Sequence, residues 1–310
     1  MKQLGQKKLS SALIETISEA RILKHIEVLE GEKEAHRTPG ALKKAGDYLS
    51  SQMRTFGLHP VHVPISPGRI VTTDANGEAC FNVIGQLPEA SPHQERLVIG
   101  AHYDTVAGSP GADDNASGLA VLLEIARVIT PRCQALRGGC VPEFAAFSLE
   151  EPGFIGSEDY LAKAEVAGTR IRGAIILECV GYTNHTPGSQ RTPPGLPFPL
   201  PDKGNFIGLV GNEPAKPIKE AFEAAARQHA PELPCIGLLV PGNGAMISDS
   251  RRSDHVPFWD KGYPAVMLTD TADFRNPHYH RASDRRETLD IPFITQVAKA
   301  LSAAVLQLLE

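Results

Sequence analysis

Short apolar runs that end in carboxylate or imidazole side chains recur along this chain of 310 residues and constrain its fold. Three such runs occupy 96–101, 143–149 and 171–178, and each is too short for a typical helix, so each predicts a buried strand. Segments with helical spacing separate these runs. Strands that alternate with helices predict an α/β fold in three α/β/α layers, with a mostly parallel mixed central sheet.

The other elements follow from the same periodicity. Helices are predicted over 13–29, 41–56, 116–129, 155–166, 214–229 and 291–309. Further strands are predicted at 59–65, 69–85, 205–210, 235–239 and 264–269. The Asn76-Gly77 pair indicates a hairpin within 69–85, and Asn115 or Ser117 is expected to cap the helix at 116–129. No repeat or linker divides the chain, so one domain is expected over residues 1–310.

Each of the three buried runs closes on side chains that suit a metal ion. His102 and Asp104 follow the first run and point to the same side, where the carboxylate can accept the second imidazole N–H. Glu150 and Glu151 follow the second run, and such neighbours repel each other unless water or a cation stabilises them. Glu178 closes the third run. Because ligands bind at the carboxyl ends of strands in open α/β sheets, we expect these side chains to converge.

A fourth candidate lies in the glycine-rich segment 108–118, where Asp113 and Asp114 precede a predicted helix. Acidic residues at a helix start are also favoured by capping and by the helix dipole. Taken alone, the segment leaves a capping role and a ligand role open.

The order of the motifs is more specific than any one of them. H-x-D is followed by G-A-D-D-N-A-S-G, E-E, L-E-x-x-G-Y, S-D-H-x-P-F-W and Y-H-x-x-x-D. Over roughly residues 80–310 this series resembles the M28 zinc peptidases, which are co-catalytic di-zinc aminopeptidases and their relatives. The resemblance implies the zinc-dependent exopeptidase fold and small peptides as substrates.

The resemblance also implies a role for each matched residue. It assigns one zinc ion to His102, Asp114 and Glu178, and a second zinc ion to Asp114, Glu151 and His280. Glu150 would be the general base and Asp104 the partner of His102. The implied reaction is hydrolysis of the N-terminal residue of a peptide by a hydroxide that bridges the two zinc ions.

The chain departs from the family pattern at the residues that stabilise the oxyanion. Several relatives have a tyrosine shortly before S-D-H, and this chain has none there. Arg251 or Arg252 would supply a charged donor instead, or both would form a solvated basic turn. Many members also carry Asp where this chain has Glu178, and either carboxylate suits zinc.

Two other histidines lie outside the ligand set, and one of them, His255, matches a family position. His278 shares its parity with His280 and is expected beside the site, in contact with substrate or in a structural role. Asp284 is expected to support His280. His255 is expected to begin a helix and to hold the segment around Trp259 in place.

Two alternatives to an aminopeptidase remain open. One is a transferase of the glutaminyl-cyclase type, which shares the fold but uses one zinc ion. The other is a non-catalytic binding module, for which decayed ligands would be expected, and none of the five ligand positions has lost its ligand type. The proline-rich stretch 183–203 follows Glu178 directly and is expected to form a wall of the substrate pocket.

Composition bears on partners and compartment. The net charge of −5 and pI of about 6.1 give no indication of a nucleic-acid partner. No uninterrupted apolar stretch of 18 residues occurs, so we expect no membrane span. The first residues lack the apolar region of a signal peptide, and the five cysteines suit a reducing compartment, so a cytoplasmic location is expected. Cys133 and Cys140 would pair only in an oxidising one, and the oligomeric state is not indicated.

Overall fold

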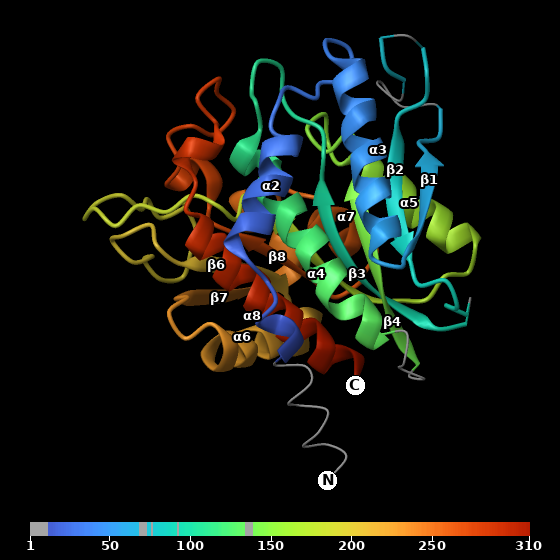
Figure 1. The fold of residues 1–310 in the computed structure, drawn as a ribbon. Coiled ribbons are helices and arrows are strands. Elements are labelled where there is room, and N and C mark those ends of the chain that lie inside the picture. The colour runs from blue at the N-terminus through green and yellow to red at the C-terminus, as the bar shows by residue number, and fades with distance from the viewer. Residues whose placement is uncertain (1–11, 68–72, 76, 92, 134–138) are drawn as a thin grey trace.

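A mixed sheet organises the computed structural model, which describes residues 12–67, 73–75, 77–91, 93–133 and 139–310 (Figure 1). Within these residues the sheet has eight strands. In chain order they are β1 (His59–Pro64), β2 (Phe81–Gln86), β3 (Glu95–His102), β4 (Cys140–Phe147), β5 (Ile171–Glu178), β6 (Ile207–Asn212), β7 (Cys235–Val240) and β8 (Ala265–Thr269).

The strand order is β1-β2-β4-β3-β5-β8-β6-β7, with a parallel centre. β4, β3, β5 and β8 run parallel to one another, and β7 runs parallel to β6. β1 and β2 are antiparallel to their neighbours, as is β6 to β8. The predicted mostly parallel mixed sheet is therefore confirmed.

Helices cover both faces of the sheet, which confirms the three predicted layers (Figure 1). The longer helices are α2 (Glu19–Leu29), α3 (Pro39–Thr55), α4 (Gly118–Cys133), α5 (Ile155–Val166), α6 (Lys216–His229), α7 (His255–Asp260) and α8 (Ile291–Leu309). On one face α3, α4, α6 and α8 contact the strands, and α2 packs outside α4 and α8. On the other face α5 contacts β2, and α7 contacts β5 and β8.

Burial on both faces explains why the central strands are continuous apolar runs rather than alternating ones. Ile99 and Leu177 join the hydrophobic cluster beneath α4 and α8. Val98 and Ile176 point the other way, into the cluster beneath α5 and α7. Each strand is therefore held from both sides, and its carboxyl end is fixed relative to its neighbours.

Two local predictions differ from the structure. The regular strand predicted at 69–85 begins only at Phe81, although Thr73 and Ala79 form an isolated antiparallel bridge; positions 68–72 and Asn76 lie outside the described residues. The helix predicted from residue 13 is interrupted, and α2 begins after Ser18, whose hydroxyl accepts the Arg21 N–H. The expectation of no signal peptide partly concerns residues 1–11, which also lie outside the described residues.

The caps predicted for α4 are wrong, because both side chains serve other contacts. The Asn115 amide donates to the carbonyl of Leu177 and accepts the N–H of Cys179. The Ser117 hydroxyl donates to the carbonyl of Asp113 and accepts the N–H of Val180. Both residues thus tie the entrance of α4 to the end of β5. All five cysteines are free thiols.

Among the described helices, α8 is long and apolar enough to cross a membrane by length and composition. The sequence expectation overlooked it, because single polar residues interrupt its apolar runs. In the structure 61% of its most apolar stretch is buried, where it packs against α4 and α6. α8 therefore belongs to the core of the described fold.

Asn82 fastens the turn after β4 to the sheet and to α5. This fully buried side chain donates to the Gly156 carbonyl at 2.8 Å and accepts the Ser148 N–H at 3.0 Å. The same turn carries Glu150 and Glu151. Asn82 therefore connects the packing of α5 to the position of two candidate site residues.

We expect Asn82→Ala to lower the free energy of unfolding by about 1–3 kcal/mol, because two buried backbone groups lose their partner. Chemical denaturation monitored by circular dichroism measures this. Asn205→Ala, at a partly exposed amide with one long hydrogen bond of 3.4 Å, is the control and should stay near wild type. Equal stability of the two variants would show that Asn82 has no such role.

Candidate metal centre

The five predicted ligands lie at one edge of the sheet, although they come from segments far apart in the sequence. His102 and Glu178 are the last residues of β3 and β5. Glu151 lies in the turn after β4, Asp114 in the turn before α4, and His280 in the loop between β8 and α8. The parallel strands end together, and so they deliver their terminal side chains to the same place.

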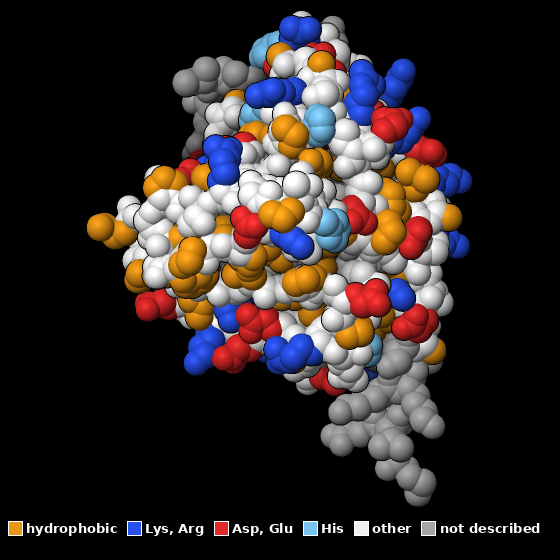
Figure 2. Space-filling view, turned by 90° about the vertical axis from the view of Figure 1, so that its left-hand side faces the viewer, with side chains coloured by type: hydrophobic (Ala, Val, Ile, Leu, Met, Phe, Trp, Pro, Cys, Tyr) orange, Lys and Arg blue, Asp and Glu red, His pale blue; other side chains and the backbone are white. Residues whose placement is uncertain are grey.

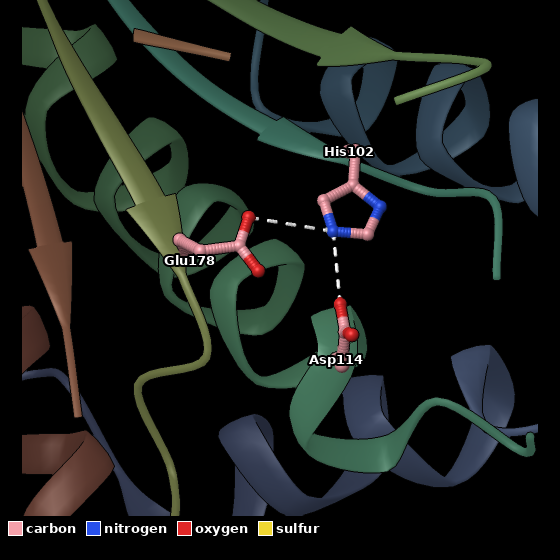
Figure 3. A group of neighbouring side chains, drawn as sticks. All are labelled: His102, Asp114 and Glu178. Atoms are coloured by element: carbon pink, nitrogen blue, oxygen red, sulfur yellow. Dashed lines mark ion pairs between the residues drawn. The ribbon is translucent and has the colours of Figure 1, made fainter. Parts of the chain in front are cut away.

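Three of these side chains form a first group (Figure 3). His102 Nε2 lies 3.0 Å from Asp114 Oδ1 and 3.5 Å from Glu178 Oε2. All three side chains are buried. The group joins two strand ends to the entrance of α4.

A second group shares Asp114 with the first. His280 Nε2 lies 3.0 Å from Asp114 Oδ2 and 3.2 Å from Glu151 Oε2. Asp114 therefore turns one carboxylate oxygen toward each histidine. Such an arrangement lets one carboxylate serve two adjacent metal positions.

The donor atoms in both groups fit a metal ion. Zinc bonds of about 2.0–2.1 Å in a tetrahedron place ligand atoms roughly 3.3 Å apart. The four measured separations, from 3.0 to 3.5 Å, bracket that value. In the described part of the chain, His102 Nε2 and Asp114 Oδ1 are buried without a hydrogen-bond partner. A bound cation would satisfy both atoms.

Backbone and side-chain hydrogen bonds hold the ligands in place. The Asp284 carboxylate accepts the N–H groups of Asp113 and Asp114 at 2.9 and 3.2 Å. Asp284 was expected to support His280, but these contacts support the turn that carries Asp114. Ser253 donates its hydroxyl proton to Glu178 Oε2 at 2.7 Å. Asp284 thus positions the turn of Asp114, which belongs to both groups, and Ser253 orients Glu178 of the first group.

Asp104 has a wider role than the predicted partner of His102. His102 Nδ1 lies 3.2 Å from the Asp104 backbone carbonyl and 3.6 Å from its carboxylate. The carboxylate instead accepts the N–H groups of Glu150 and Glu151 at 3.1 and 3.2 Å. Asp104 thus connects the end of β3 to the turn after β4.

Glu150 is buried next to the first group. Burial raises the pKa of its carboxyl well above the ordinary value; His102 opposes the rise, and Glu178 adds to it. A carboxyl group that binds a proton readily has the chemistry of a general base.

The two arginines predicted to bind the oxyanion have different surroundings. Arg251 is engaged elsewhere: its Nη2 donates to both carboxylate oxygens of Asp260 at 2.8 Å, and its Nη1 donates to the Asn243 carbonyl at 2.7 Å. Arg252 pairs with Asp273 at 2.8 Å and lines a hollow that also contains Glu178.

Neither His278 nor His255 belongs to a ligand group. His278 Nδ1 contacts the Ser283 hydroxyl at 3.0 Å, and its ring meets Tyr182 edge-on. His255 begins α7, contacts the Ser250 carbonyl at 2.7 Å and packs edge-on against Trp259. The expected structural role of His255 is therefore confirmed.

Tyr279 is a site residue that the sequence analysis missed. Its ring stacks on the His280 ring with centroids 3.9 Å apart, and it lines the hollow beside Glu178. The guanidinium of Arg252 lies over the Tyr279 ring, 5.8 Å from its centroid. The only signal was its place directly before the ligand in Y-H-x-x-x-D.

An apolar hollow leads away from the ligand groups. Its first part is lined by Glu178, Val210, Met267 and Tyr279 among others. The second part shares Pro193 and Val210 with the first and adds Leu196, Phe198, Ile236 and Leu238. Figure 2 shows apolar side chains gathered on this face of the molecule. Residues of 183–203 line this hollow, including Pro193 beside Glu178. That the hollow receives the substrate stays a prediction.

The three-layer fold and the two groups of side chains that could hold a metal ion favour a family of metal-dependent α/β proteins. Comparison with known families makes the assignment specific. The model of peptidase family M28 matches residues 82–305, and the chain belongs to that family.

Two curated relatives illustrate the range of the family. The uncharacterized protein YfbL of Escherichia coli strain K12 is 34% identical over 289 residues, which cover 84% of this chain and 86% of YfbL. Leucine aminopeptidase 1 of Trichophyton rubrum is 24% identical over 318 residues, covering 96% of this chain and 76% of that protein.

Solved structures share the fold at low sequence identity. The LapA aminopeptidase of Legionella pneumophila superposes with a TM-score of 0.75 at 17% identity, covering 98% of this chain and 75% of LapA. BSAP, a zinc aminopeptidase from Bacillus subtilis, gives 0.65 at 18% identity, with 98% and 95% covered. Macrostomum lignano glutaminyl cyclase gives 0.72 at 16% identity, with 97% and 92% covered.

We expect zinc binding to release protons and to strengthen as the pH rises. Burial lowers the pKa of His280, but contacts with Asp114 and Glu151 outweigh burial and raise it to about 10. The metal-free ring is then protonated at neutral pH, whereas a metal ion needs the neutral ring. Affinity should rise about tenfold per pH unit for each proton released.

Calorimetric titration of zinc in two buffers of different ionisation enthalpy counts the released protons. His280→Ala should remove about one proton from the count, and the control His278→Ala should leave it unchanged. Identical apparent enthalpies in both buffers would contradict the expectation.

Proposed function

We propose that this protein is a metallo-aminopeptidase that hydrolyses the N-terminal residue of peptides with two zinc ions. The ions would be held by His102, Asp114 and Glu178, and by Asp114, Glu151 and His280. The observation that carries the proposal is the pair of ligand groups that share Asp114 through separate oxygens. Membership of family M28 and the aminopeptidases among its relatives support it.

The proposed roles of the protein groups follow from where they lie. Zinc at these positions would lower the pKa of bound water and polarise a carbonyl group. Glu150 adjoins the ligand Glu151 and carries a buried carboxyl group, so we assign it the uptake of the water proton and its delivery to the departing amine. Tyr279 and Arg252 carry hydrogen-bond donors and line the same hollow as Glu178, so we assign them carbonyl binding in place of Arg251.

The hollow beside Glu178 indicates which N-terminal residues of a peptide substrate the site would prefer. Its walls are mostly apolar side chains from β6, β7, β8 and the stretch 183–203, although Asp249 lines both parts, and Glu178 belongs to the part at the ligand groups. A free α-amino group would meet the Glu178 carboxylate, and the first side chain of the peptide would lie in the hollow. We therefore propose apolar N-terminal residues as preferred substrates.

The glutaminyl-cyclase alternative predicts one zinc ion per chain. The second ligand group supports the two-zinc aminopeptidase instead. Metal analysis together with a panel of aminoacyl-nitroanilides and an N-terminal glutaminyl peptide separates the two reactions. Two zinc ions and release of nitroaniline support the proposal. One zinc ion with formation of pyroglutamate would replace it with the cyclase.

Glu150→Gln should keep both metal ions and lose most of its turnover, about 100-fold or more in kcat, because the amide cannot take up a proton. Metal content by mass spectrometry and leucine-nitroanilide hydrolysis are the measurements. Glu165→Gln, at an exposed carboxylate that pairs with Lys261, is the control and should match wild type in both. Near-wild-type turnover of Glu150→Gln would remove Glu150 from this role.

Val210→Phe should discriminate against large first residues, because Val210 lines both parts of the hollow. We expect kcat/KM for the leucine and phenylalanine nitroanilides to fall about tenfold or more relative to the alanine nitroanilide. Val166→Phe makes the same change at a side chain that is 91% exposed and should leave the ratios unaltered. Unchanged ratios in Val210→Phe would place the first side chain elsewhere.

A further inference from the structure

A cleft lies between α5 and the strands β1 and β2, which lie together at one edge of the molecule (Figure 1). It also reaches Arg96 near the start of β3, whereas the candidate ligand His102 ends that strand. At about 3.3 Å per residue, the two positions lie about 20 Å apart along the strand. The cleft is therefore a different place from the metal centre, and the proposed reaction does not use it.

Small residues on α5 explain why the cleft is open. Tyr160, Ala164 and Ala167 recur at helical spacing and form one wall of the cleft. The two alanine side chains are short and leave space above Val63 and Ile84, which line the opposite wall. The cleft has a volume of about 460 Å³, within the range of sites that bind small organic molecules.

A buried arginine lines the cleft and retains a free donor. Arg96 is 7% exposed, and its Nη2 donates to the Ser91 carbonyl at 3.0 Å. Its Nε lies 3.7 Å from Glu143 Oε2. Among the residues that the structure describes, Arg96 Nη1 is buried without a hydrogen-bond partner. Because an unsatisfied buried donor costs free energy, this nitrogen favours an acceptor brought by a bound molecule.

The charges that line the cleft are balanced within the protein. The Glu143 carboxylate is 2% exposed, accepts the Tyr160 hydroxyl at 2.5 Å and faces the Arg96 guanidinium. Lys163, also in the lining, pairs with Asp159 at 2.7 Å. A bound molecule therefore has no net charge to neutralise, and a carboxylate beside Arg96 would be repelled by Glu143.

We propose that this cleft is a binding site for a small, uncharged apolar molecule that carries a carbonyl oxygen, as an amide does. The oxygen accepts a hydrogen bond from Arg96 Nη1, and the apolar body lies between α5 and the strands β1 and β2. The single donor fixes the orientation of the molecule, and the apolar walls supply most of the affinity. The proposal is independent of the proposed function, because it uses no residue of the metal centre.

Three probes of the same size test the preference for an uncharged acceptor: phenylacetamide, phenylacetate and phenethylamine. Each is titrated into the full chain, and binding is measured by saturation-transfer NMR. We expect phenylacetamide to bind about tenfold more tightly than either charged probe, because burying an unpaired charge is costly. The comparison counts only the binding that is lost when the cleft is filled.

Two variants that introduce the same side chain locate the probe. Ala164→Phe fills the cleft, and Val210→Phe fills the hollow beside Glu178. Phenylacetamide affinity should fall about tenfold or more in Ala164→Phe, because the apolar walls lose their space, and should stay unchanged in Val210→Phe. Ala167→Phe narrows the cleft from an exposed position and should also weaken binding, so it replaces Ala164→Phe if that variant does not fold.

A paired substitution tests the donor. Arg96→Met together with Glu143→Gln removes the guanidinium without leaving a buried charge unpaired. Phenylacetamide affinity should fall about tenfold, because the hydrogen bond to a charged donor is lost.

Four results would overturn the proposal. They are tighter binding of a charged probe in the cleft, equal binding of all three probes there, loss of phenylacetamide binding in Val210→Phe but in neither alanine variant, and full affinity in the paired variant. Absence of phenylacetamide binding to wild type would also overturn it and would leave the cleft a place for water alone.

Discussion

Mutual repulsion among carboxylates gathered at one buried edge of the sheet is the constraint on which the rest of the structure depends. The charges arrive from segments far apart in the chain, and each needs a partner that water cannot provide there. Backbone N–H groups meet part of this need by donating hydrogen bonds to the carboxylates of Asp104 and Asp284. The imidazoles of His102 and His280 lie within 3.0 Å of Asp114 and meet another part of it. The remaining need is for cations, and the donor atoms are spaced to receive them.

The central strands could be predicted almost to the residue, because strands that are buried on both faces consist of continuous apolar runs. The strand predicted at 171–178 is β5 as observed. The order of the strands could not be predicted in this way, since β8 lies between β5 and β6 through contacts that no local pattern records. The caps predicted for α4 were wrong for a related reason: the Asn115 amide donates to the Leu177 carbonyl of β5 instead of capping the helix.

The same distinction holds for the candidate site. Side chains that end strands converge because the strands are parallel, so His102 and Glu178 could be placed from the sequence. Loop residues depend on the path of the backbone, which the sequence does not reveal. Arg251 pairs with Asp260 instead of turning toward the ligands, and Tyr279 reaches the hollow by stacking on His280. The family motif led to the five candidate ligands, which the structure brings together, but it did not reveal the contacts that these neighbours make.

Three residues at the edges of this centre adopt left-handed backbone conformations without being glycine: Leu149, Cys179 and His280, with φ of 58°, 49° and 57°. Such conformations cost free energy and persist only where the surrounding packing holds them. The positions of the candidate ligands therefore depend on packing in the hydrophobic clusters on both faces of the sheet. Loosening of that packing would release these backbone conformations, and the ligand groups would separate before the whole fold is lost.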